Sequence, residues 1–212
     1  TDLCPDSVGS MELVSLFDAL RAMGLDKYCT FDFGIIRGLD YYTGNGETNL
    51  IGAHREGVYG RISGDTHILY GLTLWAEYLD AIGAKCNAAG IRFGYHNHAH
   101  EFERIGDTTM MDYFLANTDP EKVFVEMDVY WAVVGGAAPV DYMNKYPGRF
   151  EVLHIKDKRE IGQSGMVGFE PIFRNFPKAG TEAIVVEMED ASSPNVLKGL
   201  RESALYLRNA KY

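Results

Sequence analysis

Arg92-Phe-Gly-Tyr-His-Asn-His-Ala-His-Glu-Phe-Glu103 places three of the chain's six histidines within twelve residues. The stretch follows an apolar segment and Gly90, and we interpret its first half as a strand near residues 91–97. Imidazole and carboxylate groups together suit borderline divalent metals such as Zn, Mn or Co. The stretch therefore indicates either a metal or sugar site, or only the polar end of a strand.

Short apolar strands and amphipathic helices alternate from Leu74 onward. A first helix ends at Gly90, and further helices are expected near 108–117, at 139–146, near 170–178 and from Pro194, with Ser193 as its N-cap. Strands are expected near 91–97 and at 123–128, 151–156 and 184–188. Such repeated units predict a parallel sheet. Right-handed crossovers then place the C-terminal ends of all strands on one face.

Polar side chains recur where these apolar strands end. With a period of two, the side chains that share a face are Glu126 with Asp128, His154 with Lys156, and Glu187 with Glu189. Charged groups in such places are costly unless they are paired or bind a metal. The candidates Glu101, Asp128, His154 and Glu187 are separated by 27, 26 and 33 residues, close to the ~30 residues of one βα unit in a barrel.

Residues from about 75 to 212 resemble the sugar phosphate isomerase/epimerase superfamily, the xylose isomerase-like TIM barrels. The motifs are Phe93-Gly-Tyr-His-Asn-His-Ala-His-Glu-Phe102, Glu126-Met-Asp-Val-Tyr-Trp131, Leu153-His-Ile-Lys-Asp157, Gly162-Gln-Ser-Gly-Met-Val-Gly-Phe169 and Val186-Glu-Met-Glu-Asp190. The resemblance implies a divalent ion, Mn, Zn, Co or Mg, held by Glu101, Asp128, His154 and Glu187. It also implies that Glu101 and Glu187 act as acid and base.

The first ligand has an alternative. If the strand ran straight on, His96, His98 and His100 would share a face and Glu101 would point the other way. His96 or His98 would then contact the ion or the sugar instead.

Three further side chains have two interpretations each. Lys156 would neutralise an enolate or alkoxide oxygen, or form an ordinary ion pair at the strand end. Trp131 would form an apolar wall for a sugar, or belong to the packing. Asp157 would orient His154 or Lys156, or form an ordinary ion pair at the strand end.

The chemistry expected from such a site begins at a carbonyl group. A divalent ion that bridges a carbonyl and a neighbouring hydroxyl acidifies the carbon between them and stabilises an enediolate, while a carboxylate moves the proton. Isomerisation, epimerisation and β-elimination from a keto sugar share this first step. The sequence does not separate them.

Residues 1–73 are expected to form a separate, short α+β segment that precedes the barrel part at 74–212. Arg37-Gly-Leu-Asp-Tyr-Tyr-Thr-Gly44 resembles the histidine-binding peptide of histidyl-tRNA synthetases, and the resemblance covers about the first 45 residues and, loosely, 70. It implies an amino-acid pocket lined by Arg37, Tyr41 and Tyr42. The ATP and tRNA motifs of class II synthetases are missing, so aminoacylation is not expected.

Four βα units do not complete an eight-stranded barrel. We therefore expect an α/β, TIM-barrel-like but incomplete barrel in a chimeric chain, which closes only when two copies associate as a homodimer. Besides a sugar enzyme, two other functions are open. One is a non-catalytic chimeric fold or scaffold with a vestigial metal site, and the other is a histidine-binding module at Arg37–Thr43.

Composition narrows the class of protein. A chain of 212 residues with 46% hydrophobic residues can bury one substantial core. A net charge of −10 without a run of Lys or Arg disfavours a nucleic-acid partner. No apolar stretch approaches the ~20 residues of a membrane span, so no membrane partner is expected. The three cysteines lack metal-finger spacing and indicate reduced packing residues. We expect a small-molecule sugar as the partner and a cytoplasmic location.

Overall fold

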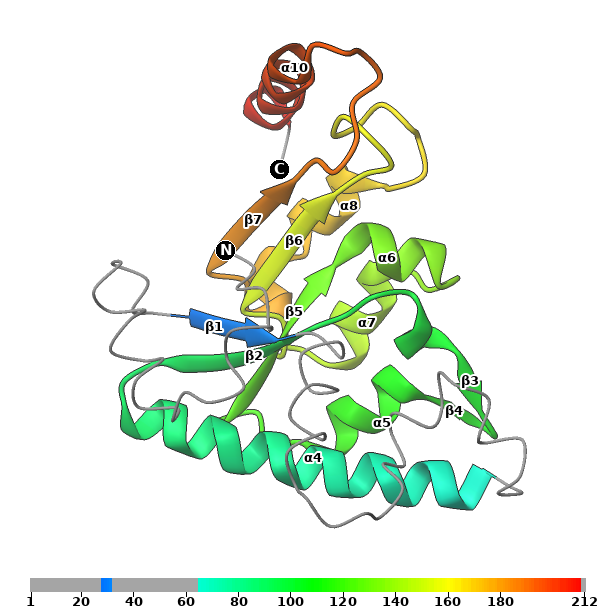
Figure 1. Ribbon diagram of the computed structural model, residues 1–212, viewed down its shortest axis with the longest axis vertical. Helices are drawn as coiled ribbons and strands as arrows, with labels where there is room; N and C mark the ends of the chain where they lie inside the picture. The colour runs from blue at the N-terminus through cyan, green and yellow to red at the C-terminus, as the bar shows by residue number, and fades with distance from the viewer. Residues whose placement is uncertain (1–27, 32–64, 211–212) are drawn as a thin grey trace. The chain divides into compact units, whose positions relative to one another are not determined.

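The computed structural model describes residues 28–31 and 65–210 (Figure 1). The histidine-binding octapeptide predicted at residues 37–44 lies outside these ranges. The chain divides into two compact units, the first made of Thr1–Tyr95 and Arg104–Val123, the second of His96–Glu103 and Phe124–Tyr212.

The described residues of the first unit form a parallel strand pair, a short antiparallel ribbon and two helices. β1 (Tyr28–Phe31) pairs in parallel with β2 (Arg92–His96), in a register that joins Tyr28 to Arg92. α4 (Asp65–Ala88) packs on α5 (Met110–Asn117), and a two-stranded antiparallel ribbon, β3 (Arg104–Ile105) with β4 (Thr108–Thr109), precedes α5. α4 begins earlier than predicted and is continuous across residues 73 and 74, where we placed the domain boundary.

Aromatic side chains fill the core of this unit. The rings of Trp75, Tyr95 and Phe114 lie 4.9–5.1 Å apart between centroids and meet edge to face or tilted, as aromatic pairs prefer. Cys86 is also fully buried and is a free thiol, as predicted for a packing residue. Burial raises the pKa of the Cys86 thiol to about 11.

The second unit is a parallel sheet with its helices. β5 (Val123–Asp128), β6 (Val152–Lys156) and β7 (Ala183–Glu187) lie side by side, in a register that joins Asp128 to His154 and Lys156 to Glu187. Helices follow these strands: α6 (Val129–Val134), α7 (Pro139–Lys145), α8 (Phe169–Arg174), α9 (Phe176–Ala179) and α10 (Val196–Asn209). Figure 1 shows α6, α7 and α8 on one side of the three strands. β5 and β6 are buried along their whole length.

The parallel α/β architecture is confirmed, and the details differ at three helices. The predicted helix at 170–178 is divided at Asn175 into α8 and α9. α10 begins at Val196 rather than at Pro194, because Asn195 and not Ser193 is the N-cap and accepts a hydrogen bond from the Lys198 N–H (3.2 Å). α6 was not predicted, since its six residues show no polar face.

Within the described residues, β7 ends the sheet and the barrel is not closed, as predicted. Ile184, Val185 and Val186 of β7 are 42–45% exposed, whereas every residue of β6 is buried. A search of the described helices finds none with the length and apolar character of a membrane span. The cytoplasmic location stays a prediction.

Candidate metal centre

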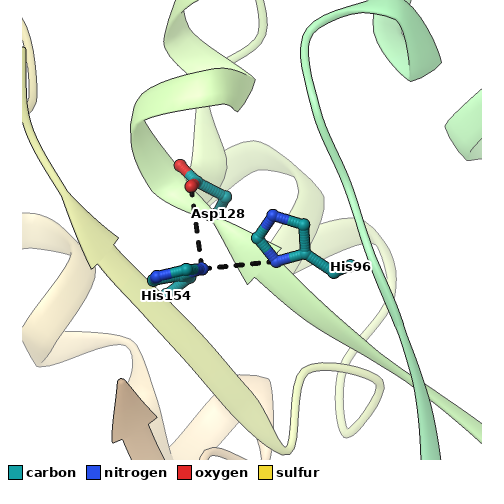
Figure 2. Close-up of side chains that lie close together, drawn as sticks. All are labelled: His96, Asp128 and His154. Atoms are coloured by element: carbon teal, nitrogen blue, oxygen red, sulfur yellow. Dashed lines mark hydrogen bonds and ion pairs between the residues drawn. The ribbon is translucent and has the colours of Figure 1, made fainter. Parts of the chain in front are cut away.

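Three polar side chains of the second unit meet, two of them at the ends of strands. His96 is the last residue of β2, Asp128 is the last residue of β5, and His154 lies in the middle of β6. Figure 2 shows the three side chains turned toward one another, and one ligand atom from each lies within 4.8 Å of the others. The Nδ1 atom of His154 lies 3.3 Å from Nδ1 of His96 and 3.8 Å from Oδ2 of Asp128.

Asp128 uses its two carboxylate oxygens differently. Oδ1 accepts a hydrogen bond from the Trp131 N–H (2.8 Å) and so caps the N-terminus of α6. Oδ2 is buried and has no hydrogen-bond partner among the described residues. Burial raises the pKa of Asp128 to about 7, against the hydrogen bond from Trp131, which lowers it. A buried carboxylate oxygen in this state is costly unless a cation compensates it, so the site fits a metal ion.

The histidines are suited to the same role. Burial lowers the pKa of His154, and the neighbouring imidazole of His96 lowers it further. A low pKa favours the neutral imidazole, which is the form that binds metals. Two glutamates surround the pair, since Glu126 Oε2 lies 3.6 Å from Nδ1 of His96 and Glu187 Oε2 lies 3.4 Å from Nε2 of His154. Two imidazoles with carboxylates form a donor set for Zn, Mn or Co.

Lys156 links the donor cluster to β7. Its buried ammonium group lies 2.6 Å from Glu187 and 2.8 Å from Glu189, and 5.8 Å from the ring centroid of Trp131. Burial alone would lower the pKa of Lys156, but the hydrogen bonds from its ammonium group to the two glutamates outweigh burial and raise it. The strand-end ion pair considered from the sequence is therefore present. A role for Lys156 in catalysis stays a prediction.

Glu101 lies on the 3-10 helix η3 (His100–Phe102) and its side chain is buried. Its Oε2 accepts a hydrogen bond from the His98 N–H (2.9 Å), and its Oε1 lies 2.9 Å from Nε2 of His100. Glu101 is not part of the three-donor group, whereas His96, the alternative first ligand, is. The assignment of Glu101 as a ligand and as a catalytic residue stays a prediction.

The remaining predicted residues form an aromatic row beside the donors. The imidazole of His98 lies 5.0 Å from that of His96 and 5.6 Å from the ring of Trp131, between centroids. This arrangement places the predicted substrate-binding residues next to the metal donors. Their contact with a sugar stays a prediction.

Two buried side chains have contacts that the sequence did not indicate. Asn97 hydrogen-bonds to both main-chain groups of Asp128. Asp157 accepts hydrogen bonds from the N–H groups of Lys158 (2.7 Å) and Gly162 (3.0 Å) and from the Ser164 hydroxyl. Asp157 thus holds the loop after β6, a different role from orienting His154 or Lys156. Both are polar residues that directly follow the observed end of a strand, Asn97 after β2 and Asp157 after β6.

Comparisons with known proteins agree with this arrangement. The family described as "Xylose isomerase-like TIM barrel" matches residues 13–210. An inosose dehydratase of Lacticaseibacillus casei is 25% identical over 157 residues, which cover 62% of this chain and 52% of the relative. An inosose dehydratase of Geobacillus kaustophilus is 31% identical over 88 residues, covering 40% of this chain and 28% of the relative. The chain spans about half the length of the first of these curated relatives.

A solved structure resembles the chain more closely. A sugar phosphate isomerase/epimerase from Parabacteroides distasonis superposes with a TM-score of 0.64 at 37% identity, covering 71% of this chain and 57% of that one. The family match begins at residue 13 and so includes most of the segment for which we expected a different origin. These comparisons give no support to a synthetase-like segment or to a chimera. That expectation came from the octapeptide and a looser resemblance of the preceding residues, without the ATP and tRNA motifs.

Proposed function

We propose that this chain, which belongs to the xylose isomerase-like TIM barrel family, carries a divalent-metal site for the isomerisation, epimerisation or elimination of a sugar or keto sugar. The observation that carries the proposal is the meeting of His96, Asp128 and His154, with the buried Oδ2 of Asp128 directed to the cluster. The names of the relatives, inosose dehydratase and sugar phosphate isomerase/epimerase, support a sugar as the substrate class.

We assign the ion to His96, Asp128 and His154, with Glu187 as a further ligand through its position beside His154. A bound divalent ion supplies a Lewis acid that polarises a carbonyl and acidifies the adjacent C–H bond. Glu101 completes the ligand set implied by the family resemblance. It would have to exchange its contacts with His98 and His100 for the ion.

Proton transfer is assigned to Glu187. Its carboxylate is part-exposed, so a substrate can reach it, and the ammonium group of Lys156 holds it at 2.6 Å. The positive charge of Lys156 is also placed to stabilise an oxyanion that develops on the substrate. Trp131 and His98 form an aromatic wall against which the apolar face of a sugar would pack.

Metal analysis of the purified chain tests the site. We expect Mn, Co, Zn or Mg to bind at one equivalent, and His154→Ala to weaken binding strongly. Lys178→Ala is the control, since the exposed side chain of Lys178 donates to Asn144 and lies outside the three-donor group. A parent protein that binds none of these ions would overturn the proposal.

Turnover assays then separate an enzyme from a non-catalytic fold. The scaffold alternative is favoured by one observation, the open sheet edge at β7 within the described residues. We expect turnover of ketoses, 3-keto-glycosides or an inosose by the metal-loaded protein. Metal binding without any turnover would favour the scaffold. For the histidine-binding module at Arg37–Thr43, calorimetry with histidine is the test, and an absence of heat would remove it.

A further inference from the structure

Asn97 connects the two segments that supply the first donors of the site. It directly follows His96 in the chain, and its side chain is fully buried. The side-chain Oδ1 accepts a hydrogen bond from the Asp128 N–H (3.1 Å), and Nδ2 donates to the Asp128 carbonyl oxygen (3.2 Å). One amide side chain thus binds both main-chain groups of one residue, as a neighbouring peptide group in a sheet would.

These two hydrogen bonds act at the point where Asp128 needs support. β5 ends at Asp128 and α6 begins at the next residue, so the chain changes direction there. Buried main-chain groups at such a junction require partners. Asn97 provides them, while the Trp131 N–H holds Oδ1 of the side chain. With the main chain and one oxygen fixed, Oδ2 is held toward His154.

Close packing at the other end of α6 restrains the same segment. A Cβ atom at Gly135, the C-cap of α6, would lie 2.6 Å from the carbonyl oxygen of Ala99. The turn that follows His96 therefore lies directly against the end of the helix that Asp128 caps. α6 therefore contacts the 97–102 segment at both of its ends, through the hydrogen bonds between Asn97 and Asp128 and through the close approach of Gly135 to the Ala99 carbonyl oxygen.

We propose that Asn97 is a positioning residue for the metal site, which fixes the Asp128 carboxylate relative to His96. This inference rests on the proposed function, because it assigns Asn97 a role toward the metal ligands. Side chains that orient metal ligands typically affect metal affinity by about 10- to 100-fold when they are removed. Asn97 would do so without touching the ion.

The test compares metal affinity and the Co(II) absorption spectrum of four proteins. Asn97→Ala removes the amide, and Asn97→Leu replaces it with an apolar side chain of similar volume. We expect about 10- to 100-fold weaker Co(II) binding in both variants and a changed spectrum. The matched control is Asn175→Ala, which removes an exposed amide that donates to the Pro171 carbonyl (2.8 Å) and should leave both readouts unchanged.

A double variant tests whether Asn97 affects the affinity for Co(II) through Asp128. If Asn97 acts through Asp128, then Asn97→Ala should weaken Co(II) binding little further once Asp128→Ala is present. An equal loss in both backgrounds would overturn the inference, as would parent-like affinity and spectrum in both Asn97 variants. Hydrogen exchange of the unmodified protein gives a readout that does not depend on the folding of a variant. Slow exchange at the Asp128 amide supports the hydrogen bond from it to Asn97, and rapid exchange refutes it.

The outcomes for the two proposals are distinguishable. A parent protein that binds no Co(II) overturns the proposed function and with it the metal-directed role of Asn97. A parent that binds Co(II) while the Asn97 variants bind it equally well overturns the inference alone.

Discussion

Replacing Asp128 with asparagine should stabilise the metal-free protein and weaken its affinity for metal. The side chain is fully buried, and its pKa of about 7 lies about three units above the usual 3.8. At ~1.4 kcal/mol per pKa unit, the buried charge costs up to ~4 kcal/mol at neutral pH. Asparagine has no charge, and its amide oxygen can still accept the hydrogen bond from Trp131 that caps α6. We expect a gain of about 2–4 kcal/mol at pH 7.

The gain should depend on pH with a definite sign. Because the folded-state pKa of Asp128 is raised, its contribution to stability is complete below about pH 4 and is lost as the pH rises to about 7. The difference in unfolding free energy between Asp128→Asn and the parent should therefore be small near pH 4.5, grow toward pH 7 and then level off. Denaturant unfolding in the presence of a chelator measures it.

Asp128→Ala distinguishes the contribution of the helix N-cap to stability from that of the buried negative charge. Alanine also removes the charge but loses the N-cap, which costs about 1 kcal/mol, so it should be less stable than Asp128→Asn at every pH. Adding metal at about 100 times its Kd should stabilise the parent by ~2.7 kcal/mol and the asparagine variant far less. A pH-independent difference, or an asparagine variant less stable than the parent throughout, would refute the reasoning.

Three further predictions concern other parts of the molecule. The pKa of Cys86 is raised to about 11, so the parent should lose up to about 2 kcal/mol of unfolding free energy between pH 9 and 11, and Cys86→Ala should lack this loss in denaturant titrations. Lys156→Met leaves Glu187 and Glu189 without the buried ammonium group and should lower the unfolding free energy by about 1–3 kcal/mol. The control Lys178→Met changes an exposed side chain and should alter the unfolding free energy by less than about 0.5 kcal/mol. We expect a second copy of the chain to cover the exposed apolar side chains of β7. Sedimentation should then show a dimer whose fraction rises with protein concentration and falls in Ile184→Lys. A parent protein that stays monomeric at high concentration would contradict this.

The strands of the site could be predicted from the sequence because their side chains alternate between two environments. β5 has the predicted bounds, β6 begins one residue later than predicted, and β7 begins and ends one residue earlier than predicted. Asp128 and His154 were predicted as ligands and lie together. The period of two also predicted that Lys156 shares a face with His154 and Glu187 with Glu189, whereas the register of Lys156 beside Glu187 comes from the structure.

Contacts across the chain could not be predicted in the same way. The side chain of Asn97 forms hydrogen bonds with the main chain of Asp128, 31 residues away in the sequence. A local sequence pattern does not predict which distant backbone groups a side chain will contact. α6 was missed because its six residues show no polar face and because Asp128, its N-cap, was considered only as a ligand. The Asp128 carboxylate also caps the N-terminus of α6, where the chain passes from strand β5 into the helix.

The choice between Glu101 and His96 as the first ligand follows the same physical reasoning. The carboxylate of Glu101 already accepts the His98 N–H and lies beside His100, so binding an ion would leave a main-chain N–H to find another partner. The imidazole of His96 already lies in the donor cluster, since its Nδ1 is 3.3 Å from Nδ1 of His154 and 3.6 Å from Oε2 of Glu126. In this geometry, Glu101 stabilises the turn that carries His98, while His96 and Asp128, joined through Asn97, face the site from neighbouring strand ends. We therefore predict that the histidine-rich stretch at 92–103 contributes to the site through the imidazole of His96 and the amide of Asn97, whereas the Glu101 carboxylate in this conformation accepts the His98 N–H.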